Sequence, residues 1–579
     1  MRFIVVTGGV VSGLGKGTLV SALCRNAILA NPLLGVTNIK IDPYLNVDAK
    51  YLSPSEHGEV YVLRDGGEVD LDFGNYERAT GVTLSRDHSI TSGKVYRDVL
   101  LRERTGGYGG KTVTETAVVQ EIYNKLVRAA HLPVQRPGKP APHVPDVCVV
   151  EIGGTIEDTN NVKFIRAVSL LAADDEHEVC VVHVCPVLRL PNGEWKTKPA
   201  QNSVKALLST GLIPAVLAVR SSGVLPAHVL SKLSAAFPHL TSMRTWTLPD
   251  CADELGAVNI RRVIPVHLLQ KASALMQGAA EACPPPVPLT PRPTKWACVA
   301  IVGKYARAAD AYQSVIAALH DAADAARIKI RVKVYGSDRY ADAEQWVRVW
   351  DRDEVTGVML PGGFGTRGVE DKVMVASTCR ANRIPFLGVC LGFQCAVLSI
   401  LRDLGGAEWA NATSAECTQV TPARGDETKT KDTDETKTKA AECDEAKTAD
   451  MEGATSSPRI AIAPLTPDLA MRVGEVAITQ DAEGPIQRTS SMRYRHRYVV
   501  TEAAEEALCA ISGVRATAHS ARFRGSHAAL HRMEFIGEEH PHFVGVQGHP
   551  EFGSTPFAVA EDYLTFVTAS SREFKTCFD

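Results

Sequence analysis

Residues 2–20, "RFIVVTGGVVSGLGKGTLV", run from an apolar β-branched segment through a glycine-rich turn into a helical pattern. Such a succession is typical of the first unit of an α/β fold with a parallel sheet. The turn is close to the phosphate-binding motif G-x-x-x-x-G-K-[ST], whose backbone N–H groups surround a phosphate. However, the spacing from Gly9 to Gly15 is one residue too long, and Gly17 replaces the Ser or Thr that should follow Lys16. The stretch predicts the fold class but leaves open whether the turn binds a nucleotide.

Length and composition exclude several classes of protein. A chain of 579 residues is too long for one hydrophobic core, so we expect about two to four domains. The net charge of -3 gives no general attraction to nucleic acid or acidic membranes. No apolar segment approaches the roughly 20 residues that span a bilayer, and the N-terminus resembles no cleavable signal. The 14 cysteines include no C-x-x-C pair, which favours reduced thiols. We therefore expect a cytoplasmic protein without nucleic-acid or membrane partners.

Further apolar runs predict two doubly wound α/β domains with parallel sheets. In the first half they are "VTNIKID", "DVCVVEI", "EVCVVHVCPV" and "AVLAVRS", and in the second half "ACVAIVG", "KIRVKVY", "GVMLPGG" and "FLGVC". The runs of the first half are continuously apolar and read as buried parallel strands, and those of the second half read as a second α/β series. The proline-rich "CPPPVPLTPRP" between the two series predicts a stiff connector. We place a first domain at residues 1–282, a linker at 283–296 and a second domain at 297–579.

Residues 421–458 differ in composition from the rest of the second domain. "DETKTK" occurs twice and "DEAKT" follows, with almost no large apolar residues. Such a segment cannot offset its own ordering entropy by burial. We expect a disordered or loosely ordered insertion, and both a regulatory role and a merely tolerated insertion remain open.

The second domain contains the pattern of a cysteine nucleophile. "FLGVCLGFQ" reads as a strand, a tight turn around Cys390 and a helix, which is the nucleophile-elbow arrangement with cysteine in place of serine. A helix N-terminus favours the thiolate, although a buried cysteine between two glycines would look the same. Further along, "FVGVQGHPEF" places His549 and Glu551 after another apolar strand. A cysteine nucleophile needs such a base and an acceptor that orients it, so we predict a Cys-His-Glu triad.

An oxyanion hole is also predicted. In "LPGGFG" the pair Gly362 and Gly363 could turn an amide toward the thiol, and the N–H of Leu391 could supply a second donor. A plain strand-ending turn is the alternative. "GVCLGFQ" together with "HPE" resembles the class I (triad) glutamine amidotransferase family, which hydrolyses glutamine to glutamate and ammonia. The resemblance implies that five residues form the oxyanion and glutamine-binding site: Gly363, Leu391, Gln394, Glu416 and Arg497.

Charged residues gather near predicted strand ends of the first domain. Lys40 lies in "KIDPYLNVD", Asp70 and Asp72 in "GGEVDLDFGNYER", and Glu151 ends the run in "VVEIGGTIED". Carboxylates at the carboxyl ends of strands beside a phosphate loop suit Mg²⁺. The lysines and glutamine of "GEWKTKPAQNSVK" suit a triphosphate or a polar base. Each feature also has a plain reading as a solvated acid, a structural partner or an exposed lysine.

Taken in order, these stretches resemble one family over nearly the whole chain. "TGGVVSGLGKG", "KIDPYLNVD", "HGEVYVLRDGGEVDLDFGNYER", "VEIGGTIED" and "KTKPAQ", followed by "VGKYARAADAYQSV", "LPGGFGTRGVE", "GVCLGFQ" and "HPEF", are similar to the CTP synthase family. The resemblance implies a P-loop-like (dethiobiotin-synthetase-like) synthase domain fused to a class I glutaminase domain. ATP with Mg²⁺ would phosphorylate the 4-oxygen of UTP, and ammonia from L-glutamine would displace that phosphate to give CTP.

The resemblance further implies roles for individual residues. The ATP site would comprise Gly13, Leu14, Gly15, Lys16, Gly17, Thr18, Lys40 and Asp72. Asp72 and Glu151 would hold Mg²⁺. The UTP and CTP sites would comprise Ser12, Asp158, Asn160, Lys196, Lys198, Gln201 and Lys232. CTP would be a feedback inhibitor and GTP an allosteric activator, with Arg472 resembling part of the GTP site. The family also implies a homotetramer that can stack into filaments.

Two segments depart from the family pattern, and two alternative functions remain. Gly109 and Thr114–Val118 replace the usual residues near the subunit contact and nucleotide sites, and "TWTLPDCADEL" matches the adenine side poorly, so no adenine residue is assigned. Another glutamine-dependent ATP amidoligase is one alternative, and "KTKPAQ" and "EIGGTIED" argue against it. A non-catalytic filament-forming paralogue is the other, and the intact triad with Lys16 and Asp72 argues against that.

Overall fold

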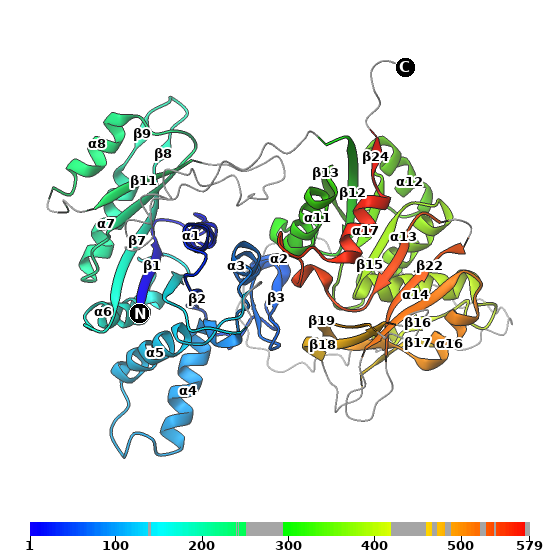
Figure 1. Ribbon diagram of the computed structural model, residues 1–579, viewed down its shortest axis with the longest axis horizontal. Coiled ribbons are helices and arrows are strands. Elements are labelled where there is room, and N and C mark those ends of the chain that lie inside the picture. The colour runs from blue at the N-terminus through cyan, green and yellow to red at the C-terminus, as the bar shows by residue number, and fades with distance from the viewer. Residues whose placement is uncertain are drawn as a thin grey trace, which may run out of the picture.

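The structure is a computed structural model, and it describes residues 1–136, 141–238, 240, 243–249, 293–418, 459–465, 472–480, 488–520, 529–537 and 540–573. The predicted insertion at 421–458 and most of the predicted linker lie outside the described residues. Figure 1 shows two α/β lobes, an N-terminal lobe in blue to teal and a C-terminal lobe in green to red. Within the described ranges, no helix has the length and apolarity needed to cross a membrane.

The N-terminal lobe is built on a parallel sheet, whose seven described strands follow the order β11-β10-β7-β1-β6-β2-β5. The strands are β1 (Arg2–Gly8), β2 (Val36–Asp42), β5 (Ser89–Thr91), β6 (Val147–Ile152), β7 (Glu178–Pro186), β10 (Val216–Ser221) and β11 (Arg244–Pro249). Four apolar runs of the sequence correspond to β2, β6, β7 and β10, so their prediction as buried parallel strands is confirmed.

Helices cover both faces of this sheet. Successive residues of a strand point to opposite faces, and in β1 Ile4 and Val6 pack on one side while Phe3 and Val5 pack on the other. The first side is covered by α1 (Lys16–Ala30) and α3 (Asp72–Thr80). The second is covered by α4 (Ser92–Arg104), α5 (Glu115–Ala130), α6 (Val162–Ala172), α7 (Lys198–Ser209) and α8 (Ala227–Ala235). This is the doubly wound arrangement that the sequence predicts.

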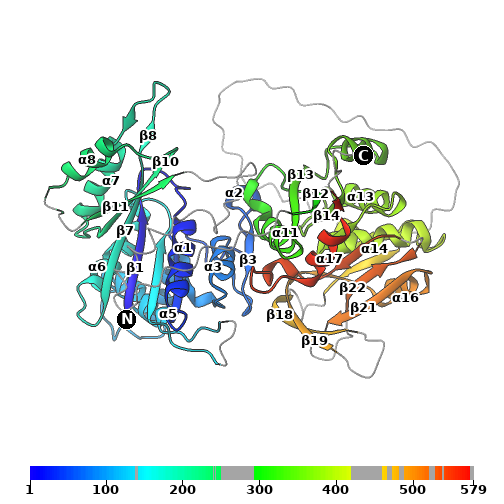
Figure 2. The ribbon, with the colours of Figure 1, turned by 45° about the horizontal axis from the view of Figure 1, so that its top comes forward.

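Four short elements project from the N-terminal lobe toward the C-terminal lobe, and α3 is one of them. The others are α2 (Pro54–His57) and the hairpin of β3 (Val60–Val62) and β4 (Glu68–Asp70). Figures 1 and 2 both show α2, α3 and β3 between the two sheets. Contacts across the lobes start from this region, as described below.

The C-terminal lobe contains a mixed sheet, with the path β13-β12-β14-β15-β23-β22-β21-β18-β19 in its described part. Its strands are β12 (Lys295–Gly303), β13 (Ile328–Gly336), β14 (Gly357–Leu360), β15 (Phe386–Val389), β18 (Arg472–Gln480), β19 (Arg488–His496), β21 (Val514–Ser520), β22 (Leu530–Phe535) and β23 (Phe543–Val546). The four predicted strands β12, β13, β14 and β15 form the parallel part together with β23. The antiparallel extension from β22 to β19 was not anticipated, because strands such as "RTSSMRYRH" contain no continuous apolar run.

Helices also cover both faces of the second sheet. One face carries α11 (Gln313–Ala326) and α17 (Glu561–Ala569), and the other carries α12 (Ala343–Arg352), α13 (Val369–Ala381) and α14 (Leu391–Leu404). Smaller elements are β8 (Leu188–Arg189), β9 (Trp195–Lys196), β16 (Thr413–Ser414), α15 (Ala415–Thr418), β17 (Ile460–Pro464), β20 (Tyr498–Val500), α16 (Glu502–Ala510) and β24 (Arg572–Glu573).

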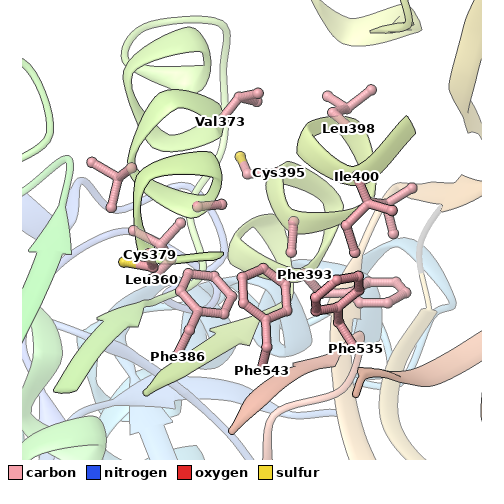
Figure 3. Packing of buried hydrophobic residues seen from close by; sticks show 14 of the residues in the cluster. Leu360, Val373, Cys379, Phe386, Phe393, Cys395, Leu398, Ile400, Phe535 and Phe543 are labelled. Carbon is pink, nitrogen blue, oxygen red and sulfur yellow. The ribbon is translucent and has the colours of Figure 1, made fainter. Parts of the chain in front are cut away.

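An aromatic cluster fixes the position of α14 on the sheet. In Figure 3, Phe393 of α14 lies beside Phe386 of β15 and Phe543 of β23, in a packed layer under α13 and α14. The rings of Phe386 and Phe543 are stacked with centroids 4.4 Å apart. Because Phe393 is held in the first turn of α14, the turn that joins β15 to α14 has a fixed place at the edge of the sheet.

Candidate active sites

The turn between β15 and α14 presents Cys390 in a strained conformation. Cys390 has φ 54° and ψ -106°, a positive φ that is uncommon for a residue other than glycine. The flanking glycines permit the turn, because a Cβ on Gly388 would lie 2.6 Å from the carbonyl oxygen of Gly392, and a Cβ on Gly392 would lie 2.0 Å from that of Leu360. Strain of this kind gathers at functional sites, and here it sets the thiol at the N-terminus of α14.

His549 lies beside this thiol and is oriented by Glu551. Its Nδ1 is 2.7 Å from Oε1 of Glu551, and its ring stacks on Phe552 at 4.9 Å between centroids. Burial alone would lower the pKa of His549, but the charges of Glu551 and Cys390 outweigh it and raise this pKa to about 10. The site therefore favours an imidazolium next to the Cys390 sulfur, which is the arrangement that activates a cysteine nucleophile. The three residues predicted as a triad are brought together.

The loop of residues 360–365 lies against the triad and is held by two buried lysines. A Cβ on Gly362 would lie 3.0 Å from Cε1 of His549, so the backbone approaches the imidazole closely. Lys372 donates to the carbonyl of Pro361 at 2.8 Å, and Lys304 donates to that of Phe364 at 3.0 Å. Lys304 and Lys372 were not predicted from the sequence, because a buried lysine that holds a loop has no local signature.

The predicted glutamine-binding residues lie around this loop. Glu416 Oε1 accepts from the N–H of Gly365 at 2.8 Å, and Leu391 is the first residue of α14. The Gln394 amide donates to the carbonyl of Tyr498 at 3.0 Å and to Gln547 Oε1 at 3.1 Å, so it is used inside the protein. Arg497 lies over the ring of Phe364 at 5.4 Å. Gly363 lies inside the loop, 3.3 Å from Leu391 when a Cβ is added.

The glycine-rich turn of the first lobe is also strained. Gly13 and Gly15 have φ of 74° and 81°, and Val10, which lies within the lengthened spacing, has φ 78°. A positive φ at a β-branched residue is a true outlier. Lys16 begins α1 and donates to the carbonyl of Gly154 at 2.7 Å, and burial lowers the pKa of this lysine. Thr18 follows on α1, while Leu14 and the exposed Ser12 lie in the turn.

Gly17, which replaces the hydroxyl residue of the common motif, has a structural explanation. A Cβ at this position would lie 2.2 Å from Oδ1 of Asp72. The carboxylate of α3 therefore packs directly on the backbone of α1, where only glycine leaves room. Gly17 therefore lets the Asp72 carboxylate lie close to the start of α1, where Lys16 is.

Lys40 lies at the centre of a cluster of carboxylates. Its Nζ pairs with Asp72 and is 3.3 Å from Asp70, 3.6 Å from Glu151 and 3.9 Å from Asp42. Burial would lower the pKa of Lys40, but the surrounding carboxylates raise it well above its ordinary range. Burial raises the pKa of Asp42 to about 8 and also raises that of Glu151. The cluster holds more acidic than basic groups and lies in a buried place.

This donor set fits a divalent cation bound together with phosphates. Four carboxylates face Lys40, with Lys16 as a second nearby cation, so full ionisation would leave two surplus negative charges. In the part of the chain that the structure describes, no group of three or more His, Cys, Asp or Glu side chains is arranged to hold a metal alone. Mg²⁺ is usually held by one or two carboxylates with phosphate oxygens and water, which matches Asp72 and Glu151.

The residues predicted to bind UTP or CTP are spread over four segments, of which the turn with Ser12 is described above. Asp158 caps a short 3-10 helix by accepting from the N–H of Asn160 at 2.9 Å. Lys196 on β9 pairs with Glu194 at 2.6 Å. Gln201 on α7 donates to Thr197 at 3.2 Å. Two further lysines, on α7 and α8, are exposed: Lys198 and Lys232. Arg472 begins β18, and its side chain is not among the described ones.

A buried polar contact joins the two lobes beside the triad, and no motif of the sequence predicts it. The Tyr61 hydroxyl of β3 is 2.8 Å from Glu77 Oε2 and 2.9 Å from the carbonyl of Phe552. Arg493 of β19 donates to this hydroxyl at 2.8 Å and pairs with Glu77 at 2.8 Å. Arg495 pairs with Glu68 of β4 at 2.7 Å. These partners lie more than 400 residues apart in the chain, so no local pattern links them.

The pocket over Cys390 is consequently walled by both lobes. Its lining includes Pro54, Glu59 and Val60 from the N-terminal lobe, together with Gly362, Cys390 and His549 from the C-terminal lobe. A product released at the thiol therefore faces the lobe that carries the Lys16, Lys40 and Asp72 cluster.

Comparison with known proteins matches the two lobes of the chain to two different protein families. Residues 2–257 match the family model described as "CTP synthase N-terminus", and residues 307–564 match "Glutamine amidotransferase class-I". CTP synthase 1-B of Xenopus laevis is 34% identical, with 98% of this chain and 93% of that protein covered. CTP synthase 1 of Homo sapiens shows the same identity and coverage. CTP synthase of Methanosarcina mazei is 40% identical over 73% of this chain and 77% of that protein. The chain belongs to the CTP synthase family.

Proposed function

We propose that this protein makes CTP from UTP, ATP and glutamine. Glutamine is hydrolysed at Cys390, and the ammonia aminates a UTP that has been phosphorylated in the N-terminal lobe. The observation that carries the proposal is the pocket of Cys390, whose walls come from both lobes. Two half-reactions on separate proteins would not need such a shared wall.

The triad accounts for the glutaminase half-reaction. The Cys390 thiolate attacks the amide carbon of glutamine, and N–H groups of the 360–365 loop and of Leu391 stabilise the oxyanion. His549 then gives its proton to the leaving ammonia, and the thioester that remains is hydrolysed by water. Glu551, at 2.7 Å from Nδ1, holds the imidazole and balances its charge.

Amination requires that ammonia stays unprotonated until it reaches UTP. A carbonyl oxygen is a poor leaving group, and phosphorylation by ATP turns the 4-oxygen of UTP into a good one. Lys16 and Lys40 neutralise the transferring phosphoryl group. Mg²⁺, held by Asp72 and Glu151, would supply further charge neutralisation on the phosphates. UTP is assigned to Ser12, Asp158, Asn160, Lys196, Lys198, Gln201 and Lys232.

The remaining parts of the proposal rest on the family resemblance. They are a cytoplasmic location, a homotetramer with filaments as a further assembly, GTP as activator of glutamine hydrolysis and CTP as feedback inhibitor. Within the change at 109–118, Gly109 and residues 114–116 are exposed, as a subunit contact would require, whereas Val118 is buried in the core of the N-terminal lobe.

Replacement of Cys390→Ala tests the proposed division of labour. The variant should lose CTP formation from glutamine and keep CTP formation from added ammonium chloride, measured by absorbance as UTP is converted. Serine in place of the exposed Cys509 is the matched control, and it should keep both activities. If the wild type forms no CTP with either nitrogen source, the proposed function is wrong. If Cys390→Ala still uses glutamine, the assigned nucleophile is wrong.

A further inference from the structure

A run of hydrogen bonds crosses the lobe interface between α3 and the N-terminus of α11. Asn75 lies one turn after Asp72 on α3, and its side-chain oxygen accepts from Gln313 Nε2 at 3.0 Å and from Arg78 Nη2 at 3.1 Å. Arg78 is buried and donates through its other terminal nitrogen to the Ser314 hydroxyl at 3.0 Å. Gln313 and Ser314 are the first two residues of α11 in the glutaminase lobe.

The far end of this run reaches the pocket of Cys390. Glu59 Oε2 accepts from the backbone N–H of Ser314 at 2.9 Å, and Glu59 lines the pocket. Tyr312, the N-cap residue of α11, makes no side-chain capping bond. A carboxylate of the synthase lobe thus caps a helix of the glutaminase lobe, where the N-terminal dipole favours negative charge. The position of Glu59 in the pocket wall is tied to the position of α11.

The near end of the run lies in the phosphoryl-transfer cluster. Asp72 packs on the backbone of Gly17 and pairs with Lys40. Asn75 Nδ2 donates to Asp72 Oδ1 at 3.5 Å, the longest step of the run. A nucleotide phosphate at Lys16 and Lys40 competes with Asp72 for those cations, so it acts on the carboxylate that holds Asn75.

We infer that Asn75 and Gln313 are positioning residues that couple nucleotide occupancy in the synthase lobe to glutamine hydrolysis in the glutaminase lobe. The inference rests on the proposed function. Asp72 fixes the position of the Asn75 side chain, and Asn75 fixes the first turn of α11. Helix α11 in turn fixes the position of Glu59 in the wall of the pocket over Cys390. Coupling of this kind needs one element that both sites influence, and α3 with the start of α11 supplies it.

Two substitutions of Gln313 separate coupling from folding. Gln313→Met keeps the length of the side chain but removes the donor to Asn75. Gln313→Lys keeps a donor of similar reach. For each variant of the full chain we would measure glutamate release without nucleotides, glutamate release with UTP and MgATP, and CTP formation from ammonium chloride.

Gln313→Met should keep basal glutamate release and ammonia-dependent CTP formation but lose most of the stimulation by UTP and MgATP. Gln313→Lys should restore it. Couplings between linked sites are typically about 5- to 150-fold, so the loss is measurable. Asn75→Ala, which also removes the bonds to Arg78 and Asp72, should lose the stimulation at least as completely as Gln313→Met does.

Three outcomes would overturn the inference. They are wild-type hydrolysis that nucleotides do not stimulate, stimulation that survives in Gln313→Met, and a loss in Gln313→Met that Gln313→Lys does not restore. A wild type without CTP formation from ammonia would instead refute the proposed function itself.

Discussion

The absence of a side chain at Gly17 leaves the room in which Asp72 joins the phosphoryl-transfer cluster. Replacement of Gly17→Ala would place a Cβ 2.2 Å from Asp72 Oδ1, and the carboxylate is held on its other side by Lys40. Asp72 must move, and the Lys40 pair must open with it. We expect CTP formation from ammonia and MgATP to fall on the order of 10²-fold, as for other small displacements of reacting groups. Basal glutamine hydrolysis, measured as glutamate release without nucleotides, should remain.

Gly223→Ala is the matched control for this change. Gly223 has no heavy atom within 4 Å of an added Cβ, so this variant should behave as the wild type does. Ammonia-dependent activity of Gly17→Ala within about twofold of that control would contradict the packing argument, because one methyl group would then fit without moving Asp72.

Residue identities were predictable where a local pattern carries them. Cys390, His549 and Glu551 stand in short motifs with a strand before them, so the sequence alone brings them into one hypothesis. Tyr61 and Arg493 could not be found this way, because their partners come from the other lobe. The absence of Ser or Thr at Gly17 is visible in the sequence as a departure from the common motif. Its reason is not visible, because the carboxylate that needs the room lies on a distant helix.

The loop of residues 360–365 shows how an element is held in a reactive shape by buried cations. Lys304 donates to two of its carbonyls, Phe364 and Gly365, and Lys372 donates to a third. Lys304→Met keeps the apolar stem and removes both donors. The loop amides should then no longer point toward the oxyanion. In other enzymes, removal of one oxyanion donor costs about 10²- to 10³-fold in kcat.

The measurement for Lys304→Met is glutamate release, set against CTP formation from ammonia. Glutamate release should fall by about 10²- to 10³-fold or more, whereas CTP formation from ammonia should stay near the wild-type value. Lys329→Met, an exposed lysine on β13, is the control. An equal loss of both activities would show that Lys304 supports the fold of the lobe instead of the loop.

Elements were predictable where burial on both faces makes a strand continuously apolar. That holds for parallel strands such as β6 and β12, whereas β13 alternates lysine and arginine with apolar residues. It fails for β18 and β19, because β19 has no continuous apolar run and places Arg493 and Arg495 against carboxylates of the N-terminal lobe. The loop of residues 360–365 is expected near the nucleophile from its glycines, and an added Cβ on Gly362 would lie 3.5 Å from Cβ of Cys390. The two lysines that hold it carry no signal that separates them from surface lysines.

At the scale of the whole molecule, two kinds of ion pair join the lobes. Arg493 and Glu77 are buried, with side chains 10% and 5% exposed and 2.8 Å apart. Arg64, at the tip of the β3–β4 hairpin, and Glu475 of β18 are also 2.8 Å apart, but their side chains are 45% and 29% exposed. Exposed pairs contribute about 0–1 kcal/mol, whereas loss of one partner from a buried pair costs about 3–5 kcal/mol, because the other charge is left buried.

Arg493→Met should therefore loosen the contact that closes the pocket of Cys390, and Arg64→Met should not. In Arg493→Met the Glu77 carboxylate loses its cation, and the Tyr61 hydroxyl between Glu77 and Phe552 loses a donor. Ammonia would then escape to solvent and become ammonium. Glutamate release should continue while less CTP is formed per glutamate, measured in the same reaction. Added ammonium chloride should restore CTP formation, because UTP phosphorylation does not use this contact. A ratio equal to that of Arg64→Met would mean that ammonia transfer does not depend on the buried pair.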